Sequence, residues 1–267
     1  MSIEEDFTNV KPLKRFGQNY LKDKNILLKI ITEINPKPGE NIIEIGPGTG
    51  NLTEYLIEKA GKITAFEIDK RVVDELKRRF PALVIHQFDF TKINLNEFSG
   101  EEKLRITGNI PYNITSPIIF KLIEARSLVK DAILMVQFEV AKRMTAKTGT
   151  KDHGILSVLL NAFADVKFCF KVSPNVFYPK PKVHSAVVHI TFAEKLPPDL
   201  NSKLFINVVK AAFGKRRKIL KNSLSDSIFT GVDFNNSGVD LNLRAEQLTL
   251  DDFILLTKFL TRENITN

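Results

Sequence analysis

A glycine-rich turn joins an apolar, strand-like run to a helical pattern. Residues 44–50 read Glu-Ile-Gly-Pro-Gly-Thr-Gly, and the helical pattern follows from Leu52. Glycines in such a turn let the backbone bend sharply and come close to a bound ligand. The spacing departs from a dinucleotide fingerprint, because Asn51 stands where that fingerprint has its third glycine. The turn therefore predicts a ligand-binding junction between a strand and a helix.

Two carboxylates lie where the next two strand-like runs end. Glu67 can accept both hydroxyls of a ribose, and Asp89 can read an adenine edge. Open α/β sheets bind ligands at the carboxyl ends of their strands, where these side chains would meet. We therefore expect an adenosine-containing ligand. A nicotinamide-dependent dehydrogenase is the alternative at this point, since an acid about twenty residues beyond the glycines suits both cofactors.

The tetrapeptide 109–112, Asn-Ile-Pro-Tyr, ends a fourth strand-like run and is the most diagnostic feature of the sequence. It resembles the motif of methyltransferases that modify exocyclic amines of nucleic-acid bases with S-adenosylmethionine. An adenine N6 amine is a poor nucleophile, because its lone pair is delocalised into the ring. Hydrogen bonds from the amine to the Asn109 oxygen and to a backbone carbonyl around Pro111 would favour a pyramidal, reactive nitrogen. Proline adds a fixed φ without a competing N–H, and Tyr112 offers a face for stacking.

A second aromatic side chain is expected on the other face of the base. Residues 175–183 form a basic, proline-braced loop that offers Phe177, with Tyr178 as the alternative. Phenylalanine is also a common core residue, so a buried structural Phe177 is the competing interpretation.

The elements that position these residues follow from the hydrophobic pattern. Short β-branched runs alternate with helical patterns up to about Phe192, which predicts a mostly parallel sheet with helices on both faces. Beyond a proline-containing joint, apolar residues recur at helical spacing and strand-like runs disappear, which predicts a separate helical domain. The expected strands are 41–46, 62–69, 82–89, 103–110, 131–138 and 184–192, and the expected helices include 26–34, 52–59, 70–79, 116–126, 141–145 and 248–260.

Composition and charge narrow the class of protein. A hydrophobic share of 43% with 26% charged residues is ordinary for globular domains, so disordered and low-complexity classes are set aside. The most apolar stretch, 154–164, is far shorter than the roughly 20 residues that a bilayer span needs. The net charge of +8 suits either solubility or a polyanionic partner.

Cysteine and histidine usage argues against a disulfide framework or a metal site. The single Cys169 excludes an intramolecular disulfide and fits a reducing cytoplasm, and the four histidines lack metal-ligand spacing. The acidic start does not resemble a signal peptide. We therefore expect a cytoplasmic protein with no metal and no membrane partner.

Taken in order, the motifs resemble those of the ribosomal RNA small-subunit adenine dimethyltransferase family over nearly the whole chain. The matching segments are 15–21, 44–53, 66–69, 109–122, 135–144, 176–190 and 211–224. The resemblance implies a Rossmann-like class I S-adenosylmethionine-dependent methyltransferase domain at 1–195 and a smaller C-terminal all-α, RNA-binding domain at 196–267. It also implies dimethylation of the N6 amines of two adjacent adenines near the 3′ end of 16S RNA, with S-adenosyl-L-homocysteine as the cofactor product.

The same resemblance implies roles for single residues. The predicted catalytic set is Asn109, Pro111, Tyr112 and Phe177. The residues expected to contact the cofactor are Gln18, beside its methionine end, and Asn19, Leu21, Gly46, Glu67, Asp89 and Asn109. Three positions depart from the family pattern: Phe138 where Lys is frequent, His184 where Asp is usual, and Tyr20 in place of Phe.

A basic cluster is expected to dock RNA from a helix of the small domain, although such a charge run is more often a solvated face. Its members are Lys215, Arg216, Arg217, Lys218 and Lys221. The expected partner is small-subunit ribosomal RNA, in an immature 30S particle, and the expected state is a monomer. Two alternatives remain. One is a large-subunit RNA or DNA adenine methyltransferase, and the other is a ribosome-assembly binding factor for which methylation is secondary.

Overall fold

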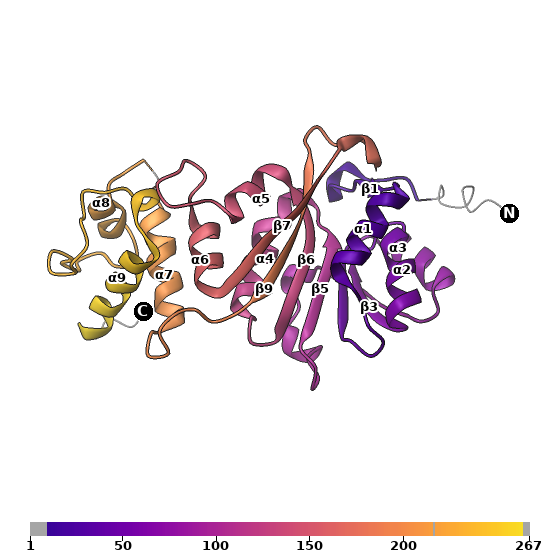
Figure 1. Ribbon diagram of the computed structural model, residues 1–267, viewed down its shortest axis with the longest axis horizontal. Coiled ribbons are helices and arrows are strands. Elements are labelled where there is room, and N and C mark those ends of the chain that lie inside the picture. The colour runs from indigo at the N-terminus through magenta and orange to yellow at the C-terminus, as the bar shows by residue number, and fades with distance from the viewer. Residues whose placement is uncertain (1–9, 216, 264–267) are drawn as a thin grey trace. The chain divides into compact units, whose positions relative to one another are not determined.

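The structure is a computed structural model that describes residues 10–215 and 217–263. Its main β structure is a seven-stranded, mostly parallel sheet (Figure 1). Its strands, in spatial order, are β4 (Leu83–Gln87), β3 (Ile63–Glu67), β2 (Ile42–Ile45), β5 (Leu104–Asn109), β6 (Val129–Gln137), β9 (Ser185–Phe192) and β7 (Ala164–Val172). Neighbours from β4 through β6 pair in parallel, whereas β9 is antiparallel to β6. The predicted α/β class is confirmed, and each of the six predicted strands is present.

The helices of the first compact unit (Met1–Ala141 and Lys167–Phe192) follow from apolar spacing and capping. In the first helix, Leu27, Ile30, Ile31 and Ile34 recur on one face and are buried, and Asp23 caps the helix by accepting from the Ile26 N–H at 3.0 Å. The first three helices share one buried apolar cluster and group together in Figure 1. The helices are α1 (Lys24–Ile34), α2 (Asn51–Ala60), α3 (Lys70–Arg79), α4 (Thr115–Glu124) and α5 (Phe138–Met144), which runs past the unit boundary.

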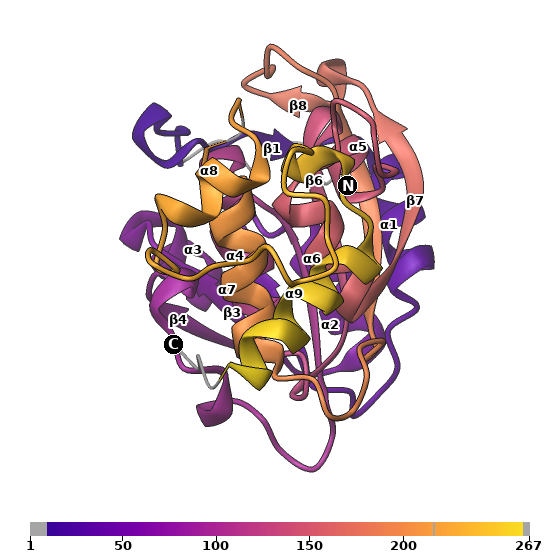
Figure 2. The same cartoon turned by 90° about the vertical axis from the view of Figure 1, so that its left-hand side faces the viewer.

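The second compact unit is helical and comprises Lys142–Val166 with Ala193–Asn267. Its aromatic core includes the edge-to-face pair Phe163 and Phe205, whose ring centroids are 5.8 Å apart. The predicted small domain begins at residue 196, whereas the observed unit also contains the 142–166 segment, because α6 packs on α7 and α9. Figure 2 looks onto α7 and α9 side by side. The helices are α6 (Ile155–Phe163), α7 (Ser202–Phe213), α8 (Leu220–Ser225) and α9 (Leu250–Arg262). No helix in the described ranges is long and apolar enough to cross a membrane.

Two short strands that the sequence did not predict join the N-terminal segment to the 175–183 loop. β1 (Tyr20–Leu21) pairs antiparallel with β8 (Phe177–Tyr178), outside the central sheet. The Lys22 N–H extends this connection by donating to the Val176 carbonyl at 2.9 Å. The segment around residues 15–21 is therefore held in place against the rest of the first unit.

The prediction that the basic cluster occupies a helix is wrong for Lys215, Arg217 and Lys218 and holds for Lys221. α7 ends at Phe213 and α8 begins at Leu220, so Lys215, Arg217 and Lys218 lie in the connecting turn and Lys221 lies on α8. The Lys218 N–H closes a turn onto the Lys215 carbonyl, and the Leu220 N–H donates to Leu243 rather than within a helix. Arg216 lies outside the described residues.

Close packing of β5 against β2 depends on Gly108. A Cβ atom at this position would lie 2.3 Å from the Ile45 carbonyl oxygen, and the φ of Gly108 is +156°. Only glycine can therefore precede Asn109 while the two strands keep their present spacing.

We predict that Gly108→Ala destabilises the folded protein by about 2–4 kcal/mol, because the backbone must shift to relieve the overlap. Thermal unfolding of the variant should show a transition several degrees below that of wild type. Gly100→Ala is the control, since a Cβ atom there meets nothing within 4 Å. A Gly108→Ala transition equal to that of the control would contradict the packing argument.

Glu44 is a buried carboxyl group inside the sheet. Its side chain is 1% exposed, and its Oε2 accepts a hydrogen bond from the Thr53 hydroxyl at 2.7 Å. Burial, together with the nearby charge of Glu67, raises the pKa of Glu44 to about 7, and the Thr53 bond only partly opposes this.

The raised pKa of Glu44 predicts that stability falls as pH rises. Below pH 4.5 the Glu44 carboxyl is protonated in both the folded and the unfolded protein. Between pH 4.5 and about 7 it ionises freely only in the unfolded protein. The free energy of unfolding therefore falls by roughly 1 kcal/mol per pH unit in this range. Glu44→Gln should flatten this slope, as measured by urea unfolding across that pH range. Glu58→Gln, at an exposed position of α2, should keep the wild-type slope. An unchanged slope in Glu44→Gln would refute the assignment.

Candidate active site

The glycine turn after β2 presents bare backbone to a cavity. Gly46, Gly48 and Gly50 have φ values of +64°, +55° and +80°, which residues with a Cβ atom rarely adopt. The Gly46 N–H donates to the Phe66 carbonyl at 2.9 Å, and this bond holds the start of the turn against β3. A Cβ atom on Gly48 would lie 2.9 Å from the ring of Tyr20, so only glycine fits against that ring.

The two predicted carboxylates lie at the carboxyl ends of β3 and β4 and line the same cavity. Glu67 is 7% exposed, and its Oε1 accepts from the N–H groups of Ile68 and Asp69, each at 2.9 Å. Burial raises the pKa of Glu67, although these backbone donors partly oppose it. Asp89 Oδ1 accepts from the Thr91 N–H at 2.9 Å and from the Thr91 hydroxyl at 2.7 Å. Both carboxylates are therefore oriented by local backbone donors.

The Asn109 side chain is oriented by the N-terminal segment. Its Nδ2 donates to the backbone carbonyl of Asn19 at 2.7 Å. Because a backbone carbonyl can only accept, the amide nitrogen must face Asn19, and Oδ1 faces away from that contact. Asn109 thus keeps an acceptor oxygen for a ligand.

The residues after Asn109 form a rigid turn. Pro111 has a φ of −53°, and its carbonyl accepts from the Ile114 N–H at 3.1 Å. The Tyr112 hydroxyl lies 2.8 Å from the Ser185 hydroxyl at the start of β9. Burial raises the pKa of Tyr112, so the ring stays a neutral phenol while it lines the cavity.

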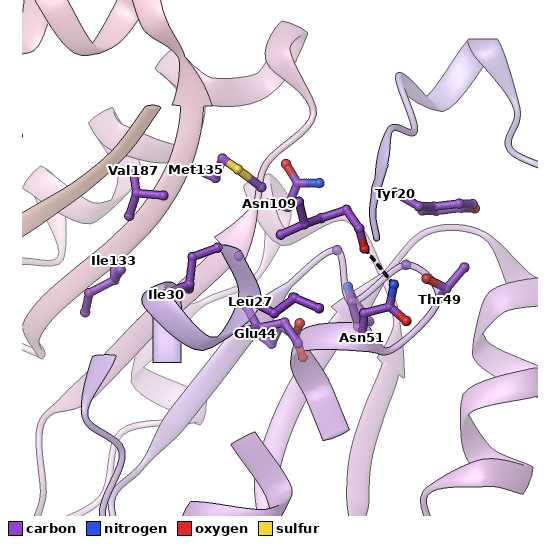
Figure 3. A pocket seen from close by; sticks show the side chains of 16 residues that line it. Tyr20, Leu27, Ile30, Glu44, Thr49, Asn51, Asn109, Ile133, Met135 and Val187 are labelled. Carbon is purple, nitrogen blue, oxygen red and sulfur yellow. Dashed lines mark hydrogen bonds between the residues drawn. The ribbon is translucent and has the colours of Figure 1, made fainter. Parts of the chain in front are cut away.

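The N-terminal segment is tied to the sheet edge at several points. Gln18 accepts from the Leu13 N–H at 2.7 Å and donates to the Asp69 carboxylate at 3.2 Å. The Asn51 amide donates to the Leu21 carbonyl at 2.6 Å, the dashed line in Figure 3. Asn51, which breaks the dinucleotide fingerprint, therefore anchors this segment.

One cavity of about 340 Å³ gathers most of the predicted residues. Two apolar residues that the sequence did not predict as site residues, Ile68 and Phe88, also line this cavity. They are 47% and 52% exposed. Their positions next to Glu67 and Asp89 in the sequence are the signal that could have predicted them. The predicted residues that line the cavity are Gln18, Asn19, Gly46, Glu67, Asp89, Asn109, Pro111 and Tyr112.

A smaller cavity of about 40 Å³ lies under the glycine turn (Figure 3). Leu21 lines this cavity and not the larger one, whereas Asn109 and Gly46 line both. Its other walls are largely apolar and include Leu27 and Met135. The two cavities therefore share Tyr20, Gly46, Gly48 and Asn109.

Phe177 does not line either cavity. It is 6% exposed and packs in the buried cluster that includes Leu21, as the competing structural interpretation expects. Tyr178 is 55% exposed, and the Lys22 ammonium lies 4.5 Å from its ring centroid. In this conformation neither ring forms a wall opposite Tyr112.

The described part of the basic cluster lies in the second unit and is exposed to solvent. The Lys215 ammonium pairs with the Asp226 carboxylate at 2.6 Å and lowers the pKa of Asp226. Arg217, Lys218 and Lys221 are exposed. Among the residues that the structure describes, no group of His, Cys, Asp and Glu side chains is placed to hold a metal ion.

Comparison with known proteins agrees with the geometry of the site. The family model for ribosomal RNA adenine dimethylases matches residues 9–262. A ribosomal RNA small subunit methyltransferase A from Chlorobium limicola is 43% identical over 256 residues, which cover 96% of each chain. Among solved structures, a dimethyladenosine transferase from Plasmodium falciparum is 29% identical with a TM-score of 0.75, covering 92% of this chain and 98% of that one. A 23S rRNA methyltransferase, ErmE, shares the fold at 24% identity and a TM-score of 0.64, covering 91% of this chain and 99% of that one. The chain belongs to the ribosomal RNA adenine dimethylase family.

Proposed function

We propose that this chain dimethylates the N6 amines of two adjacent adenines near the 3′ end of small-subunit (16S) ribosomal RNA, with S-adenosylmethionine as methyl donor. Each RNA then receives four methyl groups. The observation that carries the proposal is the orientation of Asn109, whose oxygen stays available because its nitrogen is bound to the Asn19 carbonyl. Family membership and relatives named as small-subunit methyltransferases support the choice of RNA.

The larger cavity fits S-adenosylmethionine in size and polarity. Its volume of about 340 Å³ is in the range of small-molecule sites, and the glycine turn leaves room for a ligand against the backbone. When bound, this cofactor supplies an electrophilic methyl group. In the proposal, Glu67 accepts the ribose hydroxyls and Asp89 reads the adenine edge. Gln18 lies beside the methionine end, and Asn19, Leu21, Gly46 and Asn109 make the remaining contacts.

The target amine is activated by hydrogen-bond acceptors rather than by an ionised base. Asn109 Oδ1 and a backbone carbonyl around Pro111 accept from the amine and favour a pyramidal nitrogen. The proton becomes acidic once the nitrogen carries the methyl group, so it can leave to water. After the first transfer the amine has one hydrogen left, and the pocket must admit a monomethylated nitrogen.

Aromatic stacking holds the flipped base in this proposal. The Tyr112 ring is fixed by Ser185 and offers one face, a contact typically worth about 1–3 kcal/mol. Phe177 is proposed for the second face, with the exposed Tyr178 as the alternative. Since Phe177 is buried in the described conformation, its use requires the 175–183 loop to rearrange.

RNA docking is assigned to the C-terminal domain, residues 196–267, and catalysis to residues 1–195. Exposed lysine and arginine side chains in the turn after α7 can neutralise phosphates, with Lys215 exchanging its Asp226 partner for RNA. We propose a cytoplasmic monomer that acts on an immature 30S particle. The docking set is Lys215, Arg216, Arg217, Lys218 and Lys221, of which Arg216 lies outside the described residues.

The proposal predicts dimethyladenosine in small-subunit material alone. Purified protein and radiolabelled S-adenosylmethionine would be incubated with naked 16S RNA, immature and mature small subunits, and large-subunit RNA, and the nucleosides then analysed. Asn109→Ala should reduce transfer by at least about 100-fold because it removes an acceptor at the reacting amine, while cofactor binding stays measurable. Label in large-subunit RNA would favour the alternative substrate, and binding without label would favour an assembly factor. Wild-type turnover in Asn109→Ala would refute the role of this residue.

A further inference from the structure

The Tyr20 hydroxyl is a buried polar group without a hydrogen-bond partner. The Tyr20 side chain is 7% exposed, and within the described ranges its Oη has no partner and no contact with solvent. Burying a hydroxyl without a hydrogen-bond partner is unfavourable, whereas a phenyl ring would fill the same space without that cost. The hydroxyl therefore needs an explanation other than packing.

Tyr20 cannot easily turn away from this position. Its backbone pairs with Tyr178 in the β1–β8 ribbon, and its ring lies against Gly48 of the glycine turn. Figure 3 shows the ring beside Thr49, on the side of the turn away from Ile133 and Val187. The ring is thus held between the N-terminal segment and the turn on which the cofactor is proposed to lie.

Tyr20 lies beside residues of the proposed ribose site. Tyr20 lines the larger cavity together with Gly48 and Glu67. Burial and the charges of Glu67 and Asp69 raise the pKa of Tyr20, while Arg71 opposes this, so the hydroxyl keeps its proton. A neutral hydroxyl can both donate to and accept from a sugar hydroxyl.

We propose that the Tyr20 hydroxyl is a further cofactor-binding group, which hydrogen-bonds to the ribose of the bound cofactor beside Glu67. This inference rests on the proposed function. The hydroxyl is closed off from solvent in the free protein, so the groups around it must shift slightly as the ligand enters. It gains its partner then, and the cost of burying it is removed only in the complex. Tyr20 therefore adds affinity and weakens the unliganded fold.

The test compares Tyr20→Phe with Tyr55→Phe, a matched change on α2 at a residue that lines neither cavity. Calorimetry would give the dissociation constants of S-adenosylhomocysteine and of 5′-methylthioadenosine, which has the ribose but lacks the amino acid. Tyr20→Phe should weaken both by about three- to tenfold. It should also raise the melting temperature of the unliganded protein by about 2–4 °C. Tyr55→Phe should leave both affinities unchanged.

Three results would overturn the inference. Affinities within twofold of wild type for both ligands would mean that the hydroxyl makes no contact, even if the melting temperature rises. Weaker binding of S-adenosylhomocysteine alone would place the contact at the amino-acid end. Failure of the wild-type protein to bind either ligand would refute the proposed function and this inference with it. If the wild type binds and Tyr20→Phe binds equally well, only this inference fails.

Discussion

The hydrogen bond from Asn109 to the Asn19 carbonyl is the interaction on which the candidate site depends. It joins residues 90 positions apart and is 2.7 Å long. It fixes which atom of the amide remains for a ligand, and it holds the N-terminal segment over the carboxyl edge of the sheet. Without that segment, the larger cavity would lose the walls that Gln18, Asn19 and Tyr20 supply.

The parallel sheet brings the other polar groups to the same edge. Glu67 and Asn109 are the last residues of β3 and β5, and Asp89 lies two residues beyond the end of β4. Gly108 lets β5 approach β2 closely enough for Asn109 to share the cavity. This arrangement has an energetic cost, since Glu44 and Glu67 are buried with raised pKa values and the Tyr20 hydroxyl has no hydrogen-bond partner among the described residues. Such costs are typical of sites whose polar groups are held ready for a ligand.

The central sheet could be predicted from the sequence because each of its inner strands is a short apolar run that ends at a glycine or a polar residue. The prediction missed β7, whose residues are largely exposed or half-buried and therefore lack a continuous apolar run. β1 and β8 have two residues each, too few for any periodicity. The helix expected for the basic cluster does not include Lys215, Arg217 or Lys218, because α7 ends before them and α8 begins after them. The Lys218 N–H closes a turn onto the Lys215 carbonyl instead. The position of Phe177 depends on its pairing with Leu21, which no local pattern encodes.

The orientation of Asn109 is tested most directly by Asn109→Asp. Aspartate keeps an acceptor oxygen of the same size but cannot donate to the Asn19 carbonyl, so its carboxylate is repelled from the position that the amide now occupies. Single-turnover methyl transfer at saturating cofactor and small-subunit RNA would be compared with wild type. We predict a loss of about 100-fold in the rate at saturating cofactor, since a displacement of about 1 Å at a reacting centre has effects of this size. Cofactor affinity should be weaker but still measurable, because Asn109 and the segment that it holds both line the cavity. Transfer at the wild-type rate would contradict the account, because it would show that the acceptor acts without the bond to Asn19.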